Sequence, residues 1–297
     1  MSSAEDLGGL DTEAVATWLS DHLGRPIDRV VVHGSNSSGF DSDIHFARLE
    51  GEDPAREVGL RVKGEARLVD DARREAALHD WLSDRGYPVP RILAVVEPGV
   101  ASIGPIQVME RASGASMLDA ATRRPWSVPD LLDRLAALHQ RLHLLPLDGC
   151  PTDLDVVERR LRLPRRVAEA QGHEGLRHGI ARMEELSDRF EDAPQAVCHG
   201  DFHPLNAIVD GSSVSIIDWT DAGLGDRHCD IARTVALFDL APIVAGNAVE
   251  RSVLRVVGPR LGAAYRRRYD AGLSIDPDRL ALWTPLHLLH DWSQALA

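Results

Sequence analysis

Residues 199–206 read HGDFHPLN, and residues 215–219 read SIIDW. The first stretch places Asp201 and Asn206 five residues apart in a segment where Gly and Pro favour a turn. The second stretch closes a predicted β-hairpin, which would return Asp218 to the neighbourhood of the first. Together the two stretches predict a compact site that contains two carboxylates and one amide.

Phosphoryl transfer requires groups of these types. A carboxylate can orient an acceptor hydroxyl and receive its proton, while oxygen ligands hold Mg²⁺ at the phosphates. Asp201 could supply the carboxylate and Asn206 an amide oxygen. Their spacing matches the protein-kinase catalytic loop H-R-D-x-x-x-x-N, which is followed by a metal-binding aspartate. The site therefore favours kinase chemistry.

The loop departs from protein kinases in a specific way. Gly200 stands where that loop has arginine, and His-Pro precedes Leu205 and Asn206. In this form the segment resembles the aminoglycoside phosphotransferase and choline kinase-like family, and the resemblance extends from about Val30 to the C-terminal helices. It implies a protein-kinase-like fold in which Asp201 is the catalytic base.

The same resemblance implies further roles. Asn206 and Asp218 would bind Mg²⁺, and His199 would brace the loop. The continuation also resembles the family, since residues 217–226 read IDWTDAGLGD and residues 230–232 read DIA. There Asp226 and Asp230 would hydrogen-bond the loop and cap the next helix. Residue 227 is arginine where the family often has proline, a difference expected to affect a turn only.

A phosphate-binding loop is expected upstream. Residues 33–40 read HGSNSSGF between two predicted strands. Glycines let a backbone approach phosphate oxygens, to which N–H groups and hydroxyls donate. Such turns are common, so this stretch does not decide the matter alone. The candidate nucleotide-binding residues here are Gly34, Ser35, Asn36, Ser37 and Ser38.

Lys63 is the only lysine among 33 basic residues, and it ends a strand-like run. Glu75 follows twelve residues later in a predicted helix. This order resembles the kinase lysine–glutamate pair, in which lysine contacts the α- and β-phosphates. By the same resemblance, the backbone around Glu110 would receive the purine of ATP or GTP. Backbone recognition does not distinguish these two nucleotides.

The pattern of elements predicts an α+β, bilobal, protein-kinase-like fold. A nucleotide-binding lobe with a small antiparallel sheet is expected over residues 1–110, and a mainly helical lobe with the catalytic loop and acceptor site over residues 111–297. Strands are predicted at 27–33, 43–49, 58–63, 92–96, 106–110, 207–209 and 214–217. Helices are predicted at 11–23, 68–85, 131–145, 154–170, 174–190, 231–240, 249–269 and 278–297.

Composition limits the function further. The net charge of −13 argues against nucleic acid as a partner. No run of eighteen apolar residues exists, and the first ten residues lack the basic and apolar regions of a signal peptide. Three widely spaced cysteines without a C-x-x-C pair argue against a disulfide framework. We therefore expect a cytoplasmic protein without a membrane span; its oligomeric state is not readable from the sequence.

The last predicted helix offers a candidate acceptor site. It is broadly apolar, yet polar residues recur along it at helical spacing, His287 and Asp291 among them, with Trp292 adjacent. A polar stripe on a buried helix needs partners. We expect these three residues to line the acceptor pocket and to favour a hydroxylated, cationic small molecule. The alternative is that the stripe faces solvent.

Two other functions remain open at this point. His199, Asp201 and His203 have the H-x-D-x-H spacing of a metallohydrolase, although this would leave the upstream loop, Lys63 and Glu75 unexplained. A nucleotide-binding pseudokinase with a regulatory role would use the same fold without turnover. Every expected catalytic position is filled, which favours the enzyme.

Overall fold

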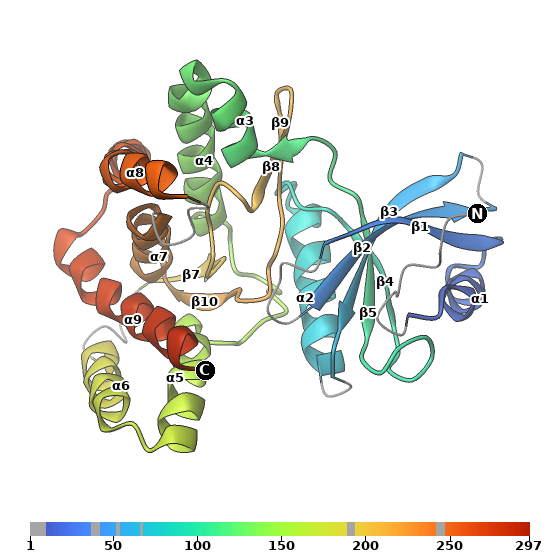
Figure 1. Ribbon diagram of the computed structural model, residues 1–297, viewed down its shortest axis with the longest axis horizontal. Helices are drawn as coiled ribbons and strands as arrows, with labels where there is room; N and C mark the ends of the chain where they lie inside the picture. The colour runs from blue at the N-terminus through green and yellow to red at the C-terminus, as the bar shows by residue number, and fades with distance from the viewer. Residues whose placement is uncertain (1–9, 37–41, 52–53, 66–67, 189–193, 242–246) are drawn as a thin grey trace. The chain divides into compact units, whose positions relative to one another are not determined.

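The computed structural model describes residues 10–36, 42–51, 54–65, 68–188, 194–241 and 247–297. The chain divides into two compact units, Met1–Ser113 and Gly114–Ala297. Figure 1 labels the elements of both units. Among the described residues, no helix is both long enough and apolar enough to cross a membrane.

The first unit is built on a five-stranded antiparallel sheet in the order β1-β2-β3-β5-β4. Its strands are β1 (Arg29–Asn36), β2 (Ser42–Glu50), β3 (Arg56–Lys63), β4 (Ile92–Val96) and β5 (Ile106–Glu110), each near its predicted position. Two helices accompany them, α1 (Thr12–Leu23) and α2 (Val69–Asp84). Helix α1 is capped by Asp11, whose Oδ1 accepts from the amides of Glu13 and Ala14.

Alternation along β3 gives the sheet two different faces. Val58 and Leu60 are fully buried in the apolar core, together with Leu19 of α1. Successive side chains of a strand point to opposite faces, so Arg61 and Lys63 lie on the other face, where both bond to Glu75 of α2. The helices α1 and α2 therefore cover opposite faces of the sheet (Figure 1). One face of the sheet is apolar, and the other carries charged side chains.

The second unit is mainly helical and contains two small sheets, β6-β8-β9 and β10-β7. Its helices are α3 (Met117–Arg123), α4 (Val128–His143), α5 (Val156–Gln171), α6 (Glu174–Ser187), α7 (Arg227–Leu240), α8 (Ala248–Gly272) and α9 (Pro277–Leu296), with a 3-10 turn η2 (Pro125–Ser127). Its strands are β6 (Ala115–Ser116), β7 (Gln195–Cys198), β8 (Ala207–Asp210), β9 (Ser213–Ile216) and β10 (Gly223–Asp226).

Some of these elements differ from the predictions. Helix α3 and the short strands β6 and β10 were not predicted, because two to seven residues carry too little periodicity. Helix α7 begins four residues earlier than predicted. Its N-cap is Asp226, whose side chain accepts from the His228 amide at 3.0 Å. The family resemblance had implied that an acid of this stretch caps the helix.

Candidate active site

The loop between β7 and β8 carries Asp201, and its backbone is fixed at two points. Gly200 has φ +80°, and a Cβ there would lie 2.5 Å from the carbonyl oxygen of Asp221, so only glycine fits. The amides of His199 and Gly200 donate to Asp230 Oδ2 and Oδ1 at 2.7 and 2.8 Å. Asp230 thus holds the loop from α7, the role that the resemblance implied.

Asp230 is itself held from α4 and α8. His139 and His143 donate from Nε2 to Asp230 Oδ2 at 2.9 and 3.2 Å. Their Nδ1 atoms accept from the hydroxyls of Tyr265 and Tyr269 at 2.5 and 2.7 Å. The side chains of Asp230, His139 and His143 are fully buried. Burial raises the pKa of Asp230, but the two histidines outweigh burial and hold it well below its usual value.

The Asp201 carboxylate is surrounded by donors. His203 Nε2 donates to its Oδ2 at 3.0 Å. Arg233 Nε of α7 donates to its Oδ1 at 3.1 Å, and Arg160 Nη2 of α5 lies 4.0 Å from the same oxygen. Burial raises the pKa of Asp201, but these neighbours more than offset it and leave the pKa far below the usual aspartate value. The carboxylate is ionised and fixed in place.

His199 braces the loop in the position expected for it. Its Nε2–H donates to the Ile217 carbonyl at 3.0 Å, and its Nδ1 accepts from the Asp201 amide at 3.2 Å. The ring is buried beside Trp219, with 4.5 Å between ring centroids. Both ring nitrogens are therefore occupied, which argues against His199 as a metal ligand. This geometry leaves the metallohydrolase alternative without support.

Asn206 and Asp218 are brought together by the hairpin of β8 and β9. The Ile217 amide donates to the Asn206 carbonyl at 2.9 Å, so Asp218 follows directly after a residue bonded to Asn206. Asn206 Nδ2 donates to the Asp201 carbonyl at 3.0 Å. Asp218 has φ +65°, the sole positive φ among described non-glycine residues. A carboxylate and an amide in adjacent positions are oxygen ligands of the type that Mg²⁺ prefers.

In the first unit, Glu75 is a buried carboxylate with three donors. Arg61 Nη1 donates to it at 2.9 Å, Lys63 Nζ at 3.3 Å and Gln107 Nε2 at 3.1 Å. The predicted Lys63–Glu75 contact is therefore present. Arg61 and Gln107 were missed, although Arg61 could have been found because it lies two residues before Lys63 on the same strand face.

Acid should weaken the first unit through Glu75. Burial raises its pKa, but Arg61 and Lys63 outweigh burial and lower the pKa from 4.5 to about 2. A lowered folded-state pKa stabilises the fold above the ordinary pKa, and this stabilisation is lost as the pH falls from about 4.5 to 2. Its full size is about 3 kcal/mol.

Urea unfolding of Glu75→Gln and the wild type at pH 7, 4 and 3 checks this prediction. The stability gap between them should narrow as the pH falls. Glu97→Gln is the control, because Glu97 pairs with Arg73 at the surface. A gap that stays constant with pH would contradict the prediction.

The other predicted nucleotide-binding residues are partly described. Gly34 and Ser35 lie in β1, and a Cβ at Gly34 would lie 3.6 Å from the ring of Phe46. The backbone of Asn36 ends β1, whereas Ser37 and Ser38 lie outside the described residues. Glu110 pairs with Arg56 at 2.9 Å and accepts from the Arg91 amide at 3.3 Å.

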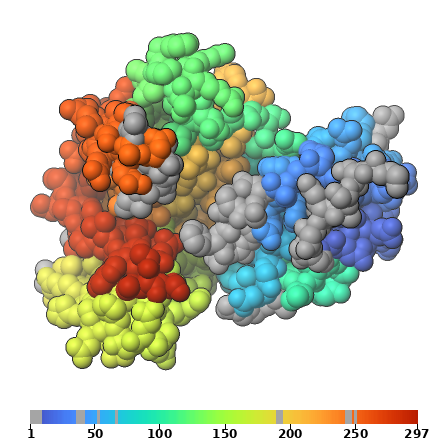
Figure 2. All heavy atoms as spheres, viewed as in Figure 1, coloured from blue at the N-terminus to red at the C-terminus, as the bar shows by residue number. Residues whose placement is uncertain are grey.

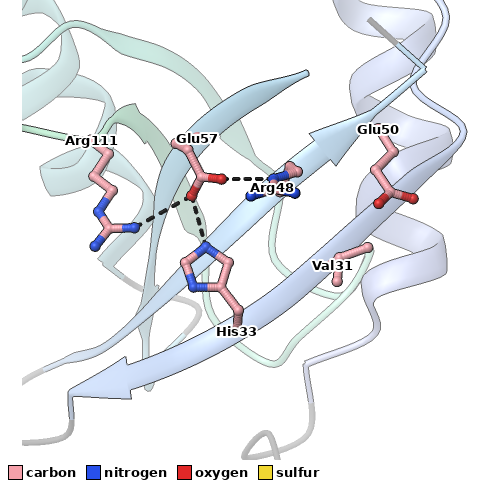
Figure 3. Close-up of a pocket in the computed structure, with 6 residues that line it drawn as sticks. All are labelled: Val31, His33, Arg48, Glu50, Glu57 and Arg111. Atoms are coloured by element: carbon pink, nitrogen blue, oxygen red, sulfur yellow. Dashed lines mark hydrogen bonds and ion pairs between the residues drawn. The ribbon is translucent and has the colours of Figure 1, made fainter. Parts of the chain in front are cut away.

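A hollow of about 280 Å³ lies in the first unit, lined by Val31, His33, Arg48, Glu50, Glu57 and Arg111 (Figure 3). Glu57 is bonded to His33, Arg48 and Arg111 at 2.7, 2.8 and 3.3 Å. Glu57 and Lys63 are six residues apart on β3 and so share a sheet face. The hollow therefore belongs to the charged face of the sheet.

The three predicted acceptor residues lie in different surroundings. Asp291 accepts from Arg233 Nη1 at 2.8 and 3.0 Å, and Arg233 also contacts Asp201. His287 is only 1% exposed and donates from Nε2 to the Cys229 carbonyl at 2.8 Å, so it offers no surface to an acceptor. Trp292 is 43% exposed. Sequence reasoning missed Arg233, whose partners Asp201 and Asp291 lie 32 and 58 residues away. It also missed Arg160 beside Asp201.

The sequence profile of the phosphotransferase enzyme family matches residues 36–283. The aminoglycoside 3'-phosphotransferase of Streptomyces fradiae is 27% identical over 258 residues, which cover 78% of this chain and 85% of that protein. The aminoglycoside 3'-phosphotransferase of Escherichia coli is 27% identical over 195 residues, which cover 62% and 70%.

Solved structures are similar at the level of the fold. One is the ternary complex of APH(2")-IIa with streptomycin and ATP, with a TM-score of 0.59, 16% identity, and coverage of 100% of this chain and 90% of that chain. Another is the choline kinase of Cryptosporidium parvum Iowa II, with a TM-score of 0.54, 12% identity, and coverage of 90% and 83%. These similarities confirm the bilobal, kinase-like α+β fold. Since the family profile covers most of the sequence, the chain belongs to the phosphotransferase enzyme family, whose members transfer a phosphoryl group to a hydroxyl.

Proposed function

We propose that this protein is a small-molecule kinase that transfers the γ-phosphoryl group of ATP or GTP to a hydroxyl of a small acceptor. One observation carries the proposal: an ionised Asp201, fixed by His203 and Arg233, on a loop that also presents Asn206. Solved structures with this fold contain bound ATP, ADP or GDP, which supports a nucleotide donor.

In this mechanism Asp201 orients the acceptor hydroxyl and takes its proton. The acceptor oxygen bonds to the γ-phosphorus as the bond to the nucleoside diphosphate breaks. Asn206 and Asp218 would hold Mg²⁺, which neutralises charge on the phosphates. Lys63, oriented by Glu75, would contact the α- and β-phosphates. Gly34, Ser35, Asn36, Ser37 and Ser38 would approach the same phosphates, and the backbone at Glu110 would receive the purine.

The acceptor is proposed from its chemistry. Curated relatives are named aminoglycoside 3'-phosphotransferases, so an aminoglycoside-like antibiotic is one candidate. Amino alcohols, sugars and related metabolites are the others, because the choline kinase shares the fold. Each carries a hydroxyl that can reach a carboxylate within hydrogen-bond distance.

A phosphotransfer screen tests this function. ATP and GTP, each with Mg²⁺, would be offered with aminoglycosides, macrolides, amino alcohols and sugars, and the phosphorylated product measured by mass. We expect transfer to at least one acceptor that requires Mg²⁺ and is lost on chelation. Lys63→Met should raise the nucleotide KM and leave the acceptor KM nearly unchanged. Nucleotide binding without transfer to any acceptor would instead support the pseudokinase.

A further inference from the structure

Two cationic side chains of β3 share one buried carboxylate. Arg61 and Lys63 lie two residues apart on the same sheet face, and both bond to Glu75 of α2. Arg61 is 9% exposed, Lys63 5% and Glu75 6%, so all three are buried. Figure 2 shows part of α2, in light blue, at the surface of the first unit, and Glu75 lies on the inner side of this helix. The kinase lysine–glutamate pair has one cation, whereas this face of the sheet has two.

The two cations bond to different oxygens of Glu75. Arg61 Nη1 donates to Oε1 at 2.9 Å, and Lys63 Nζ donates to Oε2 at 3.3 Å. The Arg61 bond has the length of a charge-assisted hydrogen bond, whereas the Lys63 bond is longer. Burial raises the pKa of Glu75, and Arg61 opposes this effect more strongly than Lys63 does. Arg61 is therefore the main cationic partner of Glu75.

Gln107 completes the attachment of α2 to the sheet. It pairs with Arg61 across β3 and β5, and its side chain is 0% exposed. Its Nε2 donates to Glu75 Oε2 and to the Ala72 carbonyl of α2, each at 3.1 Å. Glu75 would therefore keep a guanidinium and an amide as donors if the Lys63 ammonium turned away.

This arrangement changes what a phosphate must compete with. In a simple lysine–glutamate pair, a phosphate that attracts the lysine competes with a buried carboxylate whose loss of its cation is strongly destabilising. Here Glu75 keeps Arg61 at short distance. The backbone of Lys63 stays in place, because its amide donates to the Pro105 carbonyl at 3.0 Å. Only the flexible lysine stem has to move toward a phosphate.

We infer that Arg61 neutralises Glu75 so that the charge of Lys63 is available to a nucleotide phosphate. Arg61 is thus a positioning residue, which acts through Glu75 and Lys63 and does not touch the nucleotide. The inference rests on the proposed function, in which Lys63 contacts the α- and β-phosphates. It gives different roles to two positive charges on the same strand face.

Binding of ATP and of adenosine to the full chain tests this role, measured by titration calorimetry with Mg²⁺. GTP and guanosine replace them if the wild type prefers guanine. Arg61→Met should weaken ATP binding by about fivefold, or about 1 kcal/mol, because Lys63 must then balance Glu75. Adenosine binding should stay nearly unchanged, because adenosine has no phosphate. Arg73→Met is the control, since Arg73 lies on α2 and pairs with Glu97 at the surface at 2.7 Å.

The same substitution in a Glu75→Gln background gives the sharpest comparison. With residue 75 neutral, Arg61→Met should change the ratio of ATP affinity to adenosine affinity by less than about twofold. Arg61→Gln also removes the charge but can still donate to Glu75, and it replaces Arg61→Met if the latter does not fold. Urea unfolding gives an independent measurement. Arg61→Met should lower the midpoint more than Lys63→Met, because Lys63→Met leaves Glu75 bonded to Arg61.

Three results would overturn the inference. An equal loss of ATP affinity in both backgrounds would make Arg61 a direct phosphate ligand. Unchanged ATP affinity in Arg61→Met and Arg61→Gln would leave Arg61 a structural role only. A larger midpoint shift for Lys63→Met than for Arg61→Met would make Lys63 the main partner of Glu75. A wild type that binds neither ATP nor GTP, or Lys63→Met with wild-type ATP affinity, would instead contradict the proposed function.

Discussion

We expect Asp201→Asn to lower kcat by roughly three orders of magnitude, the middle of the range for losing a general base. Asparagine has nearly the same shape, and its side-chain oxygen can still accept from Arg233, which now donates at 3.1 Å. It cannot take a proton from the acceptor hydroxyl. Chemistry should therefore be lost while the loop stays in place.

The control for this substitution is Asp221→Asn. Asp221 also pairs with a buried arginine, Arg160, but is not proposed to touch the acceptor. Single-turnover phosphotransfer and nucleotide titration would be measured on both variants. Asp201→Asn should retain the nucleotide affinity of the wild type, and Asp221→Asn should retain most of its turnover. Near-normal turnover by Asp201→Asn would mean that another group is the base.

The loop that carries Asp201 could be predicted from the sequence because its groups are close along the chain or joined by one tight hairpin. Asp201 and Asn206 share a turn, and the pairing of β8 with β9 returns the chain to Asp218. Spacing alone fixes this kind of geometry. The Lys63–Glu75 contact was predicted from the resemblance to the kinase lysine–glutamate pair, in which a strand and the next helix carry the two residues.

The groups that surround Asp201 from other helices could not be predicted. Arg160 comes from α5 and Arg233 from α7, and the chain contains many other arginines on helices that look alike in sequence. His287 shows a second limit. Apolar residues occur on several sides of the last helix, so periodicity did not reveal that His287 faces inward to the Cys229 carbonyl. Which arginines contact Asp201, and which side of a helix is buried, depend on tertiary packing.

Replacing Asp230 with asparagine should have the largest effect on stability. The Asp230 carboxylate is fully buried and accepts from two backbone amides and two histidines. An asparagine amide must place an N–H₂ group against donors, and it removes the charge that these donors stabilise. Breaking a buried charged network of this kind costs roughly 3–5 kcal/mol. We therefore expect a loss of that size in the free energy of unfolding, measured with urea at pH 7.

Asp230→Asn should also lower the activity, because the Asp230 carboxylate holds the amides of His199 and Gly200 beside the candidate base. The control is Asp239→Asn, an exposed acid on the same helix, which should change the unfolding free energy by less than about 0.5 kcal/mol. At temperatures where Asp230→Asn is still folded, kcat should drop while the KM of ATP changes little. A stability loss below about 1 kcal/mol, or folded Asp230→Asn with wild-type kcat, would show that the histidines and tyrosines hold the loop without this carboxylate.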